Sequence, residues 1–433
     1  MKKREQFTSR LTVVLAMAGS AIGLGNIWRF PYLAGQNGGA AFILVYIMAC
    51  ALLAIPVFLA ECVIGRRGGS STFGAMRNLA PGSNYRWAGL ITVITPMLLL
   101  GFYSVVGGWS VDYLLKACTL RFTEDSTGLF EDLLSSTWEP IFMHTTFMIG
   151  TAIVILLGVK KGIERFTKVT MPLLFVLILV IVVFGLTLPG AGEGVAYLVK
   201  PDFSKITPSV ITSAMGQAFF SMSLGVGTIL TYASYVSKEE NLMVSAGGTA
   251  IFDLLFALLA GFAVMPAVFA AGIQPGQGPG LLFDTLPYIF SNMSPWVGAI
   301  ISILFFLSVL MAALTSSISL LEVGVAYLVE EKGVSRTKAT IGLGVIVWIV
   351  GVVCSLSSGV FNLLDHLTSD WLMPFGGLLF ALFAGWKMSK EDVRDEFTNG
   401  GTRNVRLFNV VYFLIRYIAP VGIVGIFLTT LLG

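Results

Sequence analysis

Reactive and charged side chains are scarce in this sequence. Charged residues make up 12% of its 433 positions, and it holds only two histidines and four cysteines. These six residues, His144, His366, Cys50, Cys62, Cys118 and Cys354, show neither a CxxC pair nor the spacing of a metal site. No nucleophile with a neighbouring base and no phosphate-binding loop is evident, so the sequence argues against an enzyme. A formal charge of +3 gives no case for a nucleic-acid partner.

Apolar residues are abundant instead. They make up 56% of the chain, with a mean hydropathy of +0.85, which is more apolar surface than a soluble core can hide. About 20 helical residues cross a hydrocarbon layer. Apolar windows predict eleven membrane helices, at residues 11–32, 40–64, 87–117, 141–158, 168–188, 209–236, 243–273, 296–329, 340–357, 363–386 and 408–432. We therefore expect an all-α integral membrane protein, whose basic start is retained and not cleaved as a signal peptide.

Lysine and arginine gather in alternate loops between these spans. They are Lys2, Lys3, Arg4 and Arg10, then Arg66, Arg67, Arg77 and Arg86, then Lys160, Lys161, Arg165 and Lys168, then Arg336 and Lys338, and finally Lys387, Lys390, Arg394, Arg403 and Arg406. The positive-inside rule places these loops in the cytoplasm and acidic loops, such as the one with Glu124 and Asp132, outside. The amino terminus is therefore predicted inside and the carboxyl terminus outside.

Glycine interrupts the first and the sixth predicted spans, within residues 16–31 and 219–230. A broken helix survives in a membrane where its freed backbone groups meet a ligand, an ion or other protein groups, so both breaks are candidate binding sites. The alternative is that these glycines only let helices pack closely.

The two breaks occupy equivalent places in two successive units of five helices, and an offset of five inverts the second unit in the membrane. This predicts a 5+5 inverted repeat. The expected segments are a cytoplasmic start (1–10), the first repeat (11–188), an extracellular loop (189–208), the second repeat (209–386), a cytoplasmic loop (387–407) and the eleventh span (408–433).

Four stretches resemble one known family, the neurotransmitter:sodium symporters. They are residues 16–42, 158–172, 219–236 and 311–320, and the first resembles the family's first span and external turn almost residue for residue. The resemblance implies sodium-coupled import of amino acids by alternating access, with the amino acid and the lipid bilayer as partners and no obligate protein partner evident. Bacterial members resemble this chain in having eleven spans, which implies the plasma membrane, here a bacterial inner membrane.

The resemblance implies two sodium sites built from the oxygen ligands that such a hard cation needs. The first would use the carbonyl of Ala21, the side chains of Asn26 and Asp253, and the hydroxyl and carbonyl of Ser221, completed by the carboxylate of the substrate. The second would use carbonyls of Gly19, Ile22 and Ala312 with the hydroxyls of Thr315 and Ser316. The alternative for these two hydroxyls is bonding back to carbonyls of their own helix.

Asp253 lies well inside the seventh predicted span, where an ionisable group usually has a functional partner. Chloride-dependent animal relatives resemble this chain but have Asn here and Ser one turn later, where this chain has Ala257. We therefore expect chloride-independent transport in which Asp253 balances sodium. Two alternatives stay open: a purely structural carboxylate, and a proton-coupled amino-acid transporter of the same fold.

The opposed ends of the broken helices suit a zwitterion. N–H groups of Leu24 and Gly25 would bind the substrate carboxylate, and carbonyls of Ala21 and Phe220 its ammonium group. The other expected substrate contacts are Ser221, the hydroxyls of Tyr103 and Ser223, and a wall of Leu99, Phe220, Val226, Ser316 and Leu320. Val226 stands where a bacterial member of the family has a larger aromatic residue, which favours bulky aliphatic or aromatic substrates.

Charged pairs resemble the gates of the family. Arg29 and Asp370 resemble the outer pair, and Arg4 and Glu330 the inner pair, with Phe7 and Tyr235 nearby. The family more often has Trp and Asp where this chain has Phe7 and Glu330. A channel is the rival reading, but no filter-like repeat is present.

Three further features are interpreted from the spans alone. Glu61 is expected to accept hydrogen bonds from the unwound sixth helix. The spacing between Gly162 and Pro172 favours either a segment that unwinds or an ordinary helix start. Asp112 and Glu322 are read as pathway or packing residues.

Overall fold

The computed structural model describes residues 5–123, 128–273 and 280–432, and the described chain contains helices and no strand. The helices of its first part are α1 (Arg10–Ala21), α2 (Phe30–Gln36), α3 (Ala40–Ala49), α4 (Ile55–Gly68), α5 (Thr72–Leu79), α6 (Tyr85–Cys118), α7 (Leu129–Ser135), α8 (Trp138–Leu156), α9 (Arg165–Leu186) and α10 (Ala191–Val199). The second part has α11 (Pro208–Ser221), α12 (Thr228–Ala233), α13 (Leu242–Ala270), α14 (Leu286–Ser291), α15 (Pro295–Lys332), α16 (Arg336–Leu356), α17 (Ser358–His366), α18 (Met373–Leu382), α19 (Lys390–Thr398), α20 (Val405–Phe413) and α21 (Ala419–Leu432).

Short π-helical or 3-10 turns join many of these helices into longer rods. The π-helical turns are η1 (Gly25–Arg29), η2 (Cys50–Ala54), η4 (Val159–Glu164), η6 (Leu281–Thr285), η7 (Leu367–Leu372), η8 (Phe383–Lys387) and η9 (Leu414–Ile418). The 3-10 turns are η3 (Arg121–Thr123) and η5 (Phe203–Lys205).

Nine rods of the described chain are long and apolar enough to cross a membrane. A tenth candidate is the pair 10–21 and 25–36, which bends by 55° at its break. The sixth predicted span does not form one rod, because α11 and α12 are separated by a turn at Met222–Gly227. Length and composition thus support up to ten spans in the part that the structure describes. The count of eleven and the inverted repeat stay predictions.

Local sequence explains where the broken helices stop. The Ser9 side chain caps the start of α1, which ends where Ile22 turns to extended backbone at φ −73° and ψ 103°. Thr207 caps α11, and Pro208 occupies its first turn. Beyond α11 the backbone of Ser223, Gly225 and Gly227 has positive φ. Gly225 is required there, because a β-carbon would lie 1.9 Å from the Met373 carbonyl oxygen.

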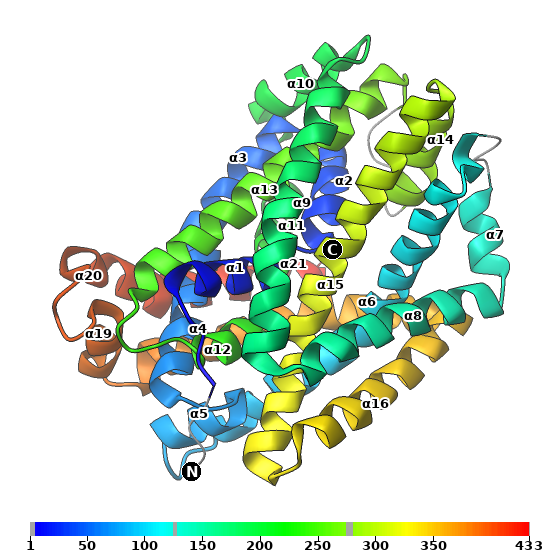
Figure 1. The fold of residues 1–433 in the computed structure, drawn as a ribbon. Coiled ribbons are helices and arrows are strands. Elements are labelled where there is room, and N and C mark those ends of the chain that lie inside the picture. The colour runs from blue at the N-terminus through cyan, green and yellow to red at the C-terminus, as the bar shows by residue number, and fades with distance from the viewer. Residues whose placement is uncertain (1–4, 124–127, 274–279, 433) are drawn as a thin grey trace.

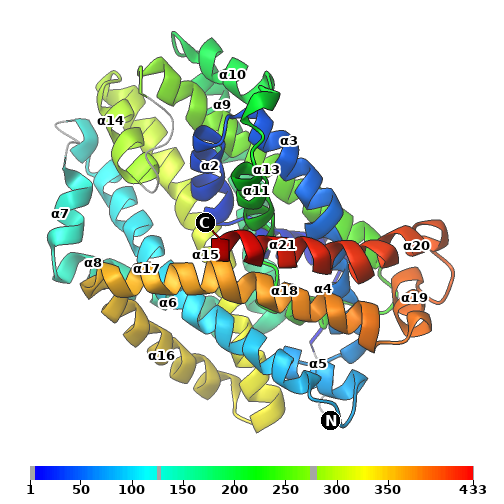
Figure 2. The ribbon, with the colours of Figure 1, turned by 180° about the vertical axis from the view of Figure 1, so that it is seen from behind.

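The connecting segments collect at two opposite ends of the helix bundle. Figures 1 and 2 show α5, α19 and α20 at the end where the chain starts, and α7, α10 and α14 at the far end. Figure 2 also shows α21 lying alongside α18, which it contacts. The broken segments lie inside the bundle: α1 packs against α9, α13 and α15, and α12 against α4 and α15. Which end faces the cytoplasm stays a prediction from the loop charges.

Candidate functional site

The two helix breaks lie against one another in the middle of the bundle. The Gln217 side chain of α11 donates a hydrogen bond of 2.7 Å to the carbonyl of Gly25, and the Ser223 hydroxyl donates one of 2.8 Å to the carbonyl of Ser20. Gly25 faces the ring of Phe220 so closely that a β-carbon there would lie 2.7 Å from Phe220 Cδ1. The sixth-span segment therefore supplies polar partners for the freed backbone of the first break, as a membrane interior requires.

A buried polar cluster lies beside these breaks, and we call it the Asp253 cluster: Asn26, Tyr46, Ser221 and Asp253. The Asn26 amide donates to Asp253 Oδ1 at 2.8 Å and to Ser221 Oγ at 3.0 Å. Ser221 donates to Asp253 Oδ2 at 2.8 Å, and the Tyr46 hydroxyl donates to Ser221 at 3.1 Å. All four side chains are fully buried. Asp253 makes no ion pair with any residue that the structure describes, so its partners are neutral.

The side chains of the Asp253 cluster carry oxygen atoms of the kinds that bind a cation. Carboxylate, amide and hydroxyl oxygens are the ligands that hard cations prefer. The structure brings together Asn26, Ser221 and Asp253, as expected from the sequence, while Ala21 lines the adjoining pocket. Tyr46 was not among the expected residues, because an isolated tyrosine in an apolar run reads as an ordinary packing residue.

The residues expected at the second sodium site also lie together, between α1 and α15. The Thr315 hydroxyl donates to the carbonyl of Ala312 at 2.9 Å in its own helix and lies 3.4 Å from the carbonyl of Ile22. The Ser316 hydroxyl bonds across to carbonyls of Ser20 and Ile22 at 3.2 and 3.4 Å. A β-carbon on Gly19 would lie 3.4 Å from Thr315 Cβ. The Thr315 hydroxyl thus bonds to its own helix and also faces a carbonyl of the first break, whereas the Ser316 hydroxyl bonds to carbonyls of the first break.

A small pocket opens where the breaks meet α6, α15 and α18. Its lining is Ala21, Gly23, Leu24, Gly25, Leu99, Tyr103, Phe220, Ser223, Val226, Ser316, Leu320 and Met373, around a cavity of about 20 Å³. Ten of the eleven residues expected to touch a substrate are in this lining, and the eleventh, Ser221, belongs to the Asp253 cluster. Gly23 and Met373 were not expected. Tyr103 accepts a hydrogen bond of 3.3 Å from the Leu24 N–H, which ties α6 to the first break.

A wider cavity of about 560 Å³ adjoins the pocket, and Tyr103 and Phe220 line both. Arg29 also lines the wider cavity. Its guanidinium lies 4.7 Å from the Phe220 ring centre and 3.7 Å from an Asp370 oxygen. His366, which was not expected here, lies 2.7 Å from the other Asp370 oxygen. The predicted outer gate residues are therefore in contact above the pocket, with Phe220 beneath them.

Near the other end of the bundle, Phe7 and Tyr235 of the expected inner gate are in contact. Phe7 meets Tyr232 and Tyr235 edge-on, with ring centres 5.9 and 6.1 Å apart, and its N–H donates to the Tyr235 carbonyl. The Tyr235 hydroxyl donates to Glu322 at 2.8 Å. Glu330 accepts a hydrogen bond of 2.6 Å from the Ser71 N–H. Arg4, its expected partner, lies outside the described residues.

The features left open by the sequence have defined surroundings. Glu322 is buried in an ion pair with Arg336 at 2.5 Å, and Asp112 pairs with Lys116 at 2.6 Å. One Glu61 oxygen accepts a hydrogen bond of 2.8 Å from the Gly225 N–H, as expected from its place beside the sixth helix. Gly162 lies in the wound π-helical turn η4, which leads straight into α9, so the structure has a helix start there.

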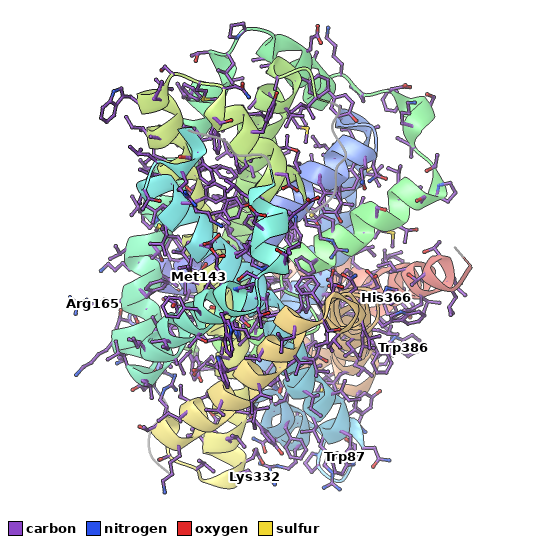
Figure 3. The ribbon with its side chains drawn as sticks, turned by 90° about the vertical axis from the view of Figure 1, so that its right-hand side faces the viewer. Trp87, Met143, Arg165, Lys332, His366 and Trp386 are labelled. Carbon is purple, nitrogen blue, oxygen red and sulfur yellow. The ribbon has the colours of Figure 1, made fainter. Side chains whose placement is uncertain are left out.

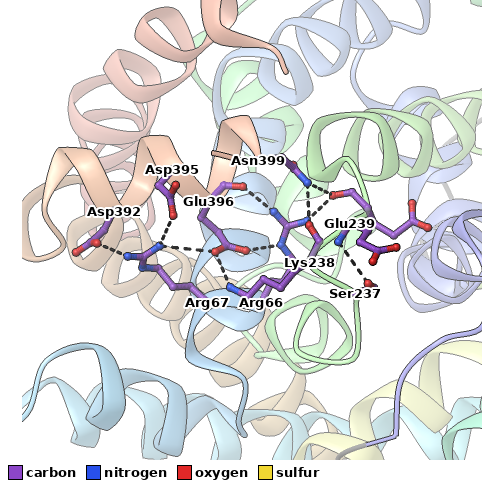
Figure 4. A network of polar contacts seen from close by, with 10 residues as sticks. Arg66, Arg67, Ser237, Lys238, Glu239, Asp392, Asp395, Glu396 and Asn399 are labelled. Carbon is purple, nitrogen blue, oxygen red and sulfur yellow. Dashed lines mark hydrogen bonds and ion pairs between the residues drawn. The ribbon is translucent and has the colours of Figure 1, made fainter. Parts of the chain in front are cut away.

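A second charge cluster, centred on the buried pair Arg66 and Glu396, joins α4, α19 and the segment that follows α12. We call it the Glu396 network: Arg66, Arg67, Lys238, Asp392, Asp395 and Glu396 (Figure 4). Arg66 pairs with Glu396 and also donates to the Glu396 carbonyl at 2.6 Å. Lys238 lies 2.8 Å from the second Glu396 oxygen, while Arg67 pairs with Asp392 and Asp395. Every acid of this network has a basic partner within the chain.

Comparisons with known proteins show relatives that match nearly the whole chain. The model of the Sodium:neurotransmitter symporter family matches residues 4–127 and 126–432. An uncharacterized sodium-dependent transporter of Bacillus subtilis is 39% identical over 99% of this chain and 98% of its own length, and one of Haemophilus influenzae is 35% identical over 99% of both. The crystal structure of MhsT in complex with L-phenylalanine has a TM-score of 0.91 and 43% identity, covering 98% of this chain and 99% of that chain.

Proposed function

The chain belongs to the sodium:neurotransmitter symporter family, and from this premise we propose that it imports hydrophobic or aromatic amino acids together with sodium, without chloride. It is a multi-pass membrane transporter and not an enzyme. A family of sodium-dependent transporters includes members with different substrates and ion requirements, so these finer assignments rest on the residues of the site.

One observation carries the proposal: Asp253 is a fully buried carboxylate whose described partners are all neutral. A buried charge without a counter-charge is costly, which favours a cation as the missing partner. Ser221 offers a hydroxyl oxygen within hydrogen-bonding distance of it, and Asn26, whose amide nitrogen donates to it, carries a further oxygen on the same side chain. We assign the first sodium ion to this cluster, with the Ala21 and Ser221 carbonyls and the substrate carboxylate as additional ligands.

The second sodium ion is assigned to Gly19, Ile22, Ala312, Thr315 and Ser316. Support comes from the two hydroxyls, which already point at the Ile22 carbonyl from the neighbouring helix. An ion there would join α1 to α15. Because both sodium sites use residues beside the same break, occupancy of one favours the geometry of the other, and linkage of this kind lets a sodium gradient drive uptake.

The substrate is assigned to the pocket between the two breaks. The N–H groups of Leu24 and Gly25 suit a carboxylate, and the Ala21 and Phe220 carbonyls suit an ammonium group. The wall, from Leu99 to Leu320, is apolar apart from hydroxyls of Tyr103, Ser223 and Ser316, and MhsT was solved with L-phenylalanine. The cavity of about 20 Å³ must widen to admit such a side chain. Phe220, which borders the wider cavity as well, is the wall residue best placed to move.

Chloride independence follows from the same carboxylate. Asp253 provides a fixed negative charge beside the first sodium site, and Ala257, one turn on, has no hydroxyl with which to hold an anion. A chloride ion is therefore unnecessary for charge balance. Protonation of Asp253 on the return step would let the empty carrier reorient without an uncompensated charge.

Alternating access is assigned to two sets of contacts. Arg29 and Asp370 close the outer side above Phe220, and Arg4 with Glu330, supported by Phe7 and Tyr235, closes the inner side. Contacts that form on one side while they break on the other are the requirement of such a mechanism. From the loop charges we assign the amino terminus to the cytoplasm and the carboxyl terminus to the outside of a bacterial inner membrane.

Uptake into proteoliposomes tests the proposal against proton coupling. Purified protein would be given labelled phenylalanine, leucine and alanine at constant pH, first with an inward sodium gradient and then with an inward proton gradient without sodium. Sodium-stimulated uptake of the larger amino acids is expected. Uptake that follows the proton gradient alone would remove both sodium assignments, and preferential uptake of alanine would contradict the assignment of a large side-chain pocket.

A further inference from the structure

Arg416 is a cation within a membrane-spanning rod that has no carboxylate partner among the described residues. It lies in η9, inside the candidate span Val405–Leu431. Its Nη1 reaches the Tyr412 hydroxyl at 3.4 Å, whereas its Nε is buried without a hydrogen-bond partner. Because a charged side chain in a span is costly, a partner of opposite charge is expected for Arg416.

Three aromatic rings fix the position of this side chain. The centre of its guanidinium lies 4.4 Å from the Trp386 ring, 5.6 Å from Tyr417 and 6.0 Å from Tyr412. The Trp386 indole donates a hydrogen bond of 2.8 Å to the Arg416 carbonyl, so the two helices are joined at this level. Cation–π contacts stabilise the charge but do not use its N–H donors, of which only Nη1 has a hydrogen bond to a described residue, and N–H donors are the groups that bind a phosphate.

The depth and outward exposure of the cage suit a lipid headgroup. Trp386 and Lys387 are the last two residues of the rod Ser358–Lys387, and tryptophan and lysine at a helix end mark the membrane interface. Trp386 is 55% exposed and Tyr417 43% exposed. Figure 3 shows Trp386 at the outer edge of the molecule. Arg416 therefore lies where the headgroup region of one leaflet meets the protein.

The charge around the cage is positive. Lys390 also lies over the Tyr412 ring, with Nζ 5.6 Å from its centre, and Lys387 is exposed next to Trp386. Of the four acids in the same loop, Asp392, Asp395 and Glu396 are already paired in the Glu396 network. The fourth, Glu391, is exposed beside Lys390, so the cage retains an excess of positive charge from Arg416, Lys387 and Lys390. A basic cluster between two spans, with aromatic neighbours, is suited to an anionic lipid.

We propose that Arg416, walled by Trp386, Tyr412 and Tyr417 and supported by Lys390, binds the headgroup phosphate of an anionic phospholipid from the leaflet that faces loop 387–407. The guanidinium donates to the phosphate oxygens, Lys390 adds a second positive charge, and the acyl chains lie along the exposed apolar faces of α18 and α21. A lipid bound there would join the two helices that carry the cage. This inference does not depend on the transported substrate.

Native mass spectrometry of the detergent-purified full chain, titrated with phosphatidylglycerol, tests the proposal. Arg416→Gln removes the charge, Arg416→Lys retains it without the planar donors, and Arg165→Gln is the matched control. Arg165 is exposed at the start of α9, at the opposite edge of the molecule from Trp386 (Figure 3). Titrations with phosphatidylcholine and competition with inorganic phosphate separate an anionic lipid from a zwitterionic lipid and from a free anion.

The expected result is that one phosphatidylglycerol binds the wild type and Arg165→Gln equally. It should bind Arg416→Gln about tenfold more weakly and Arg416→Lys with an intermediate affinity. Phosphatidylcholine should bind no better to the wild type than to Arg416→Gln. Equal binding of phosphatidylglycerol by wild type and Arg416→Gln, or an equal loss in Arg165→Gln, would overturn the proposal. Displacement of the lipid by millimolar inorganic phosphate would reassign the site to a free anion. If Arg416→Gln does not fold, the Arg416→Lys titration decides by the same criteria.

Discussion

The Asp253 cluster and the Glu396 network each contain a buried carboxylate, but the two carboxylates are completed in different ways. Glu396, 3% exposed, has Arg66 and Lys238 as ion-pair partners within the chain. Asp253, fully buried, has an amide and a hydroxyl and no cationic side chain among the described residues. A self-neutralised network holds helices together, whereas a carboxylate left with neutral partners is suited to an ion that comes and goes.

The largest effect is expected from Asp253→Asn, which removes the charge and keeps the shape. Removing one partner of a buried charge pair costs about 3–5 kcal/mol, so sodium-dependent substrate binding should need at least a hundredfold more sodium. A sodium titration of labelled phenylalanine binding at fixed pH measures this. Asp395→Asn, in the Glu396 network, is the control and should bind sodium like the wild type. An unchanged sodium requirement in Asp253→Asn would remove the distinction between the two regions.

Arg66→Ala should give the largest loss of stability. Its side chain is 2% exposed, and its removal leaves the buried Glu396 with Lys238 and a distant Arg67 as its only basic partners in the described chain. The free energy of unfolding should fall by about 3–5 kcal/mol. Thermal unfolding in detergent should show this as a lower midpoint, while sodium affinity measured at low temperature stays unchanged. A normal midpoint with weakened sodium binding would reverse the roles of the two regions.

Tyr103→Phe tests the pocket beside the Asp253 cluster. The substitution removes the acceptor of the Leu24 N–H and a hydroxyl that faces the pocket, at a cost of about 1 kcal/mol. Substrate affinity should fall about fivefold, with little change in the unfolding midpoint. Equilibrium binding of phenylalanine at saturating sodium measures the change. A lowered midpoint with unaltered affinity would show that Tyr103 serves packing alone.

Arg67→Ala should have the smallest effect, although Arg67 contacts more acids than Arg66. Its side chain is 25% exposed, and its partners Asp392 and Asp395 are 46% and 60% exposed. Exposed ion pairs contribute about 0–1 kcal/mol, because water screens them. The unfolding midpoint of this variant should therefore lie much closer to wild type than that of Arg66→Ala. Equal losses in the two variants would show that burial does not set the strength of the network.

The sequence predicted the pocket better than the network, because the pocket is built from local breaks. Glycine in residues 16–31 and 219–230 marks both breaks, and the family resemblance then names nearly all of the lining. The Arg66–Glu396 pair joins residues 330 positions apart, and no spacing reports such a contact. In the sequence, Arg66 and Arg67 serve only to predict which loops face the cytoplasm.

Single polar residues inside apolar runs were the other omission. Gln217 bonds to the first broken helix and Tyr46 to the Asp253 cluster, yet neither lies in a stretch that carries the family resemblance. A buried glutamine in a membrane helix is itself a signal, since it needs a partner, and this would have drawn attention to Gln217. Tyr46 carries no such signal, because a tyrosine packs as readily as it bonds. For the sixth span, the sequence predicted one membrane helix with a break in it. In the structure the break is so wide that α11 and α12 do not form one long helix.

The central claim, that the Asp253 carboxylate balances sodium without help from an anion, is tested most directly by replacing chloride. Labelled phenylalanine uptake into proteoliposomes would be measured under an inward sodium gradient at constant pH, in chloride and in gluconate. We expect equal sodium-stimulated uptake in the two media. Loss of uptake in gluconate would contradict the claim, because it would show that the buried carboxylate does not supply the negative charge that the sodium site needs.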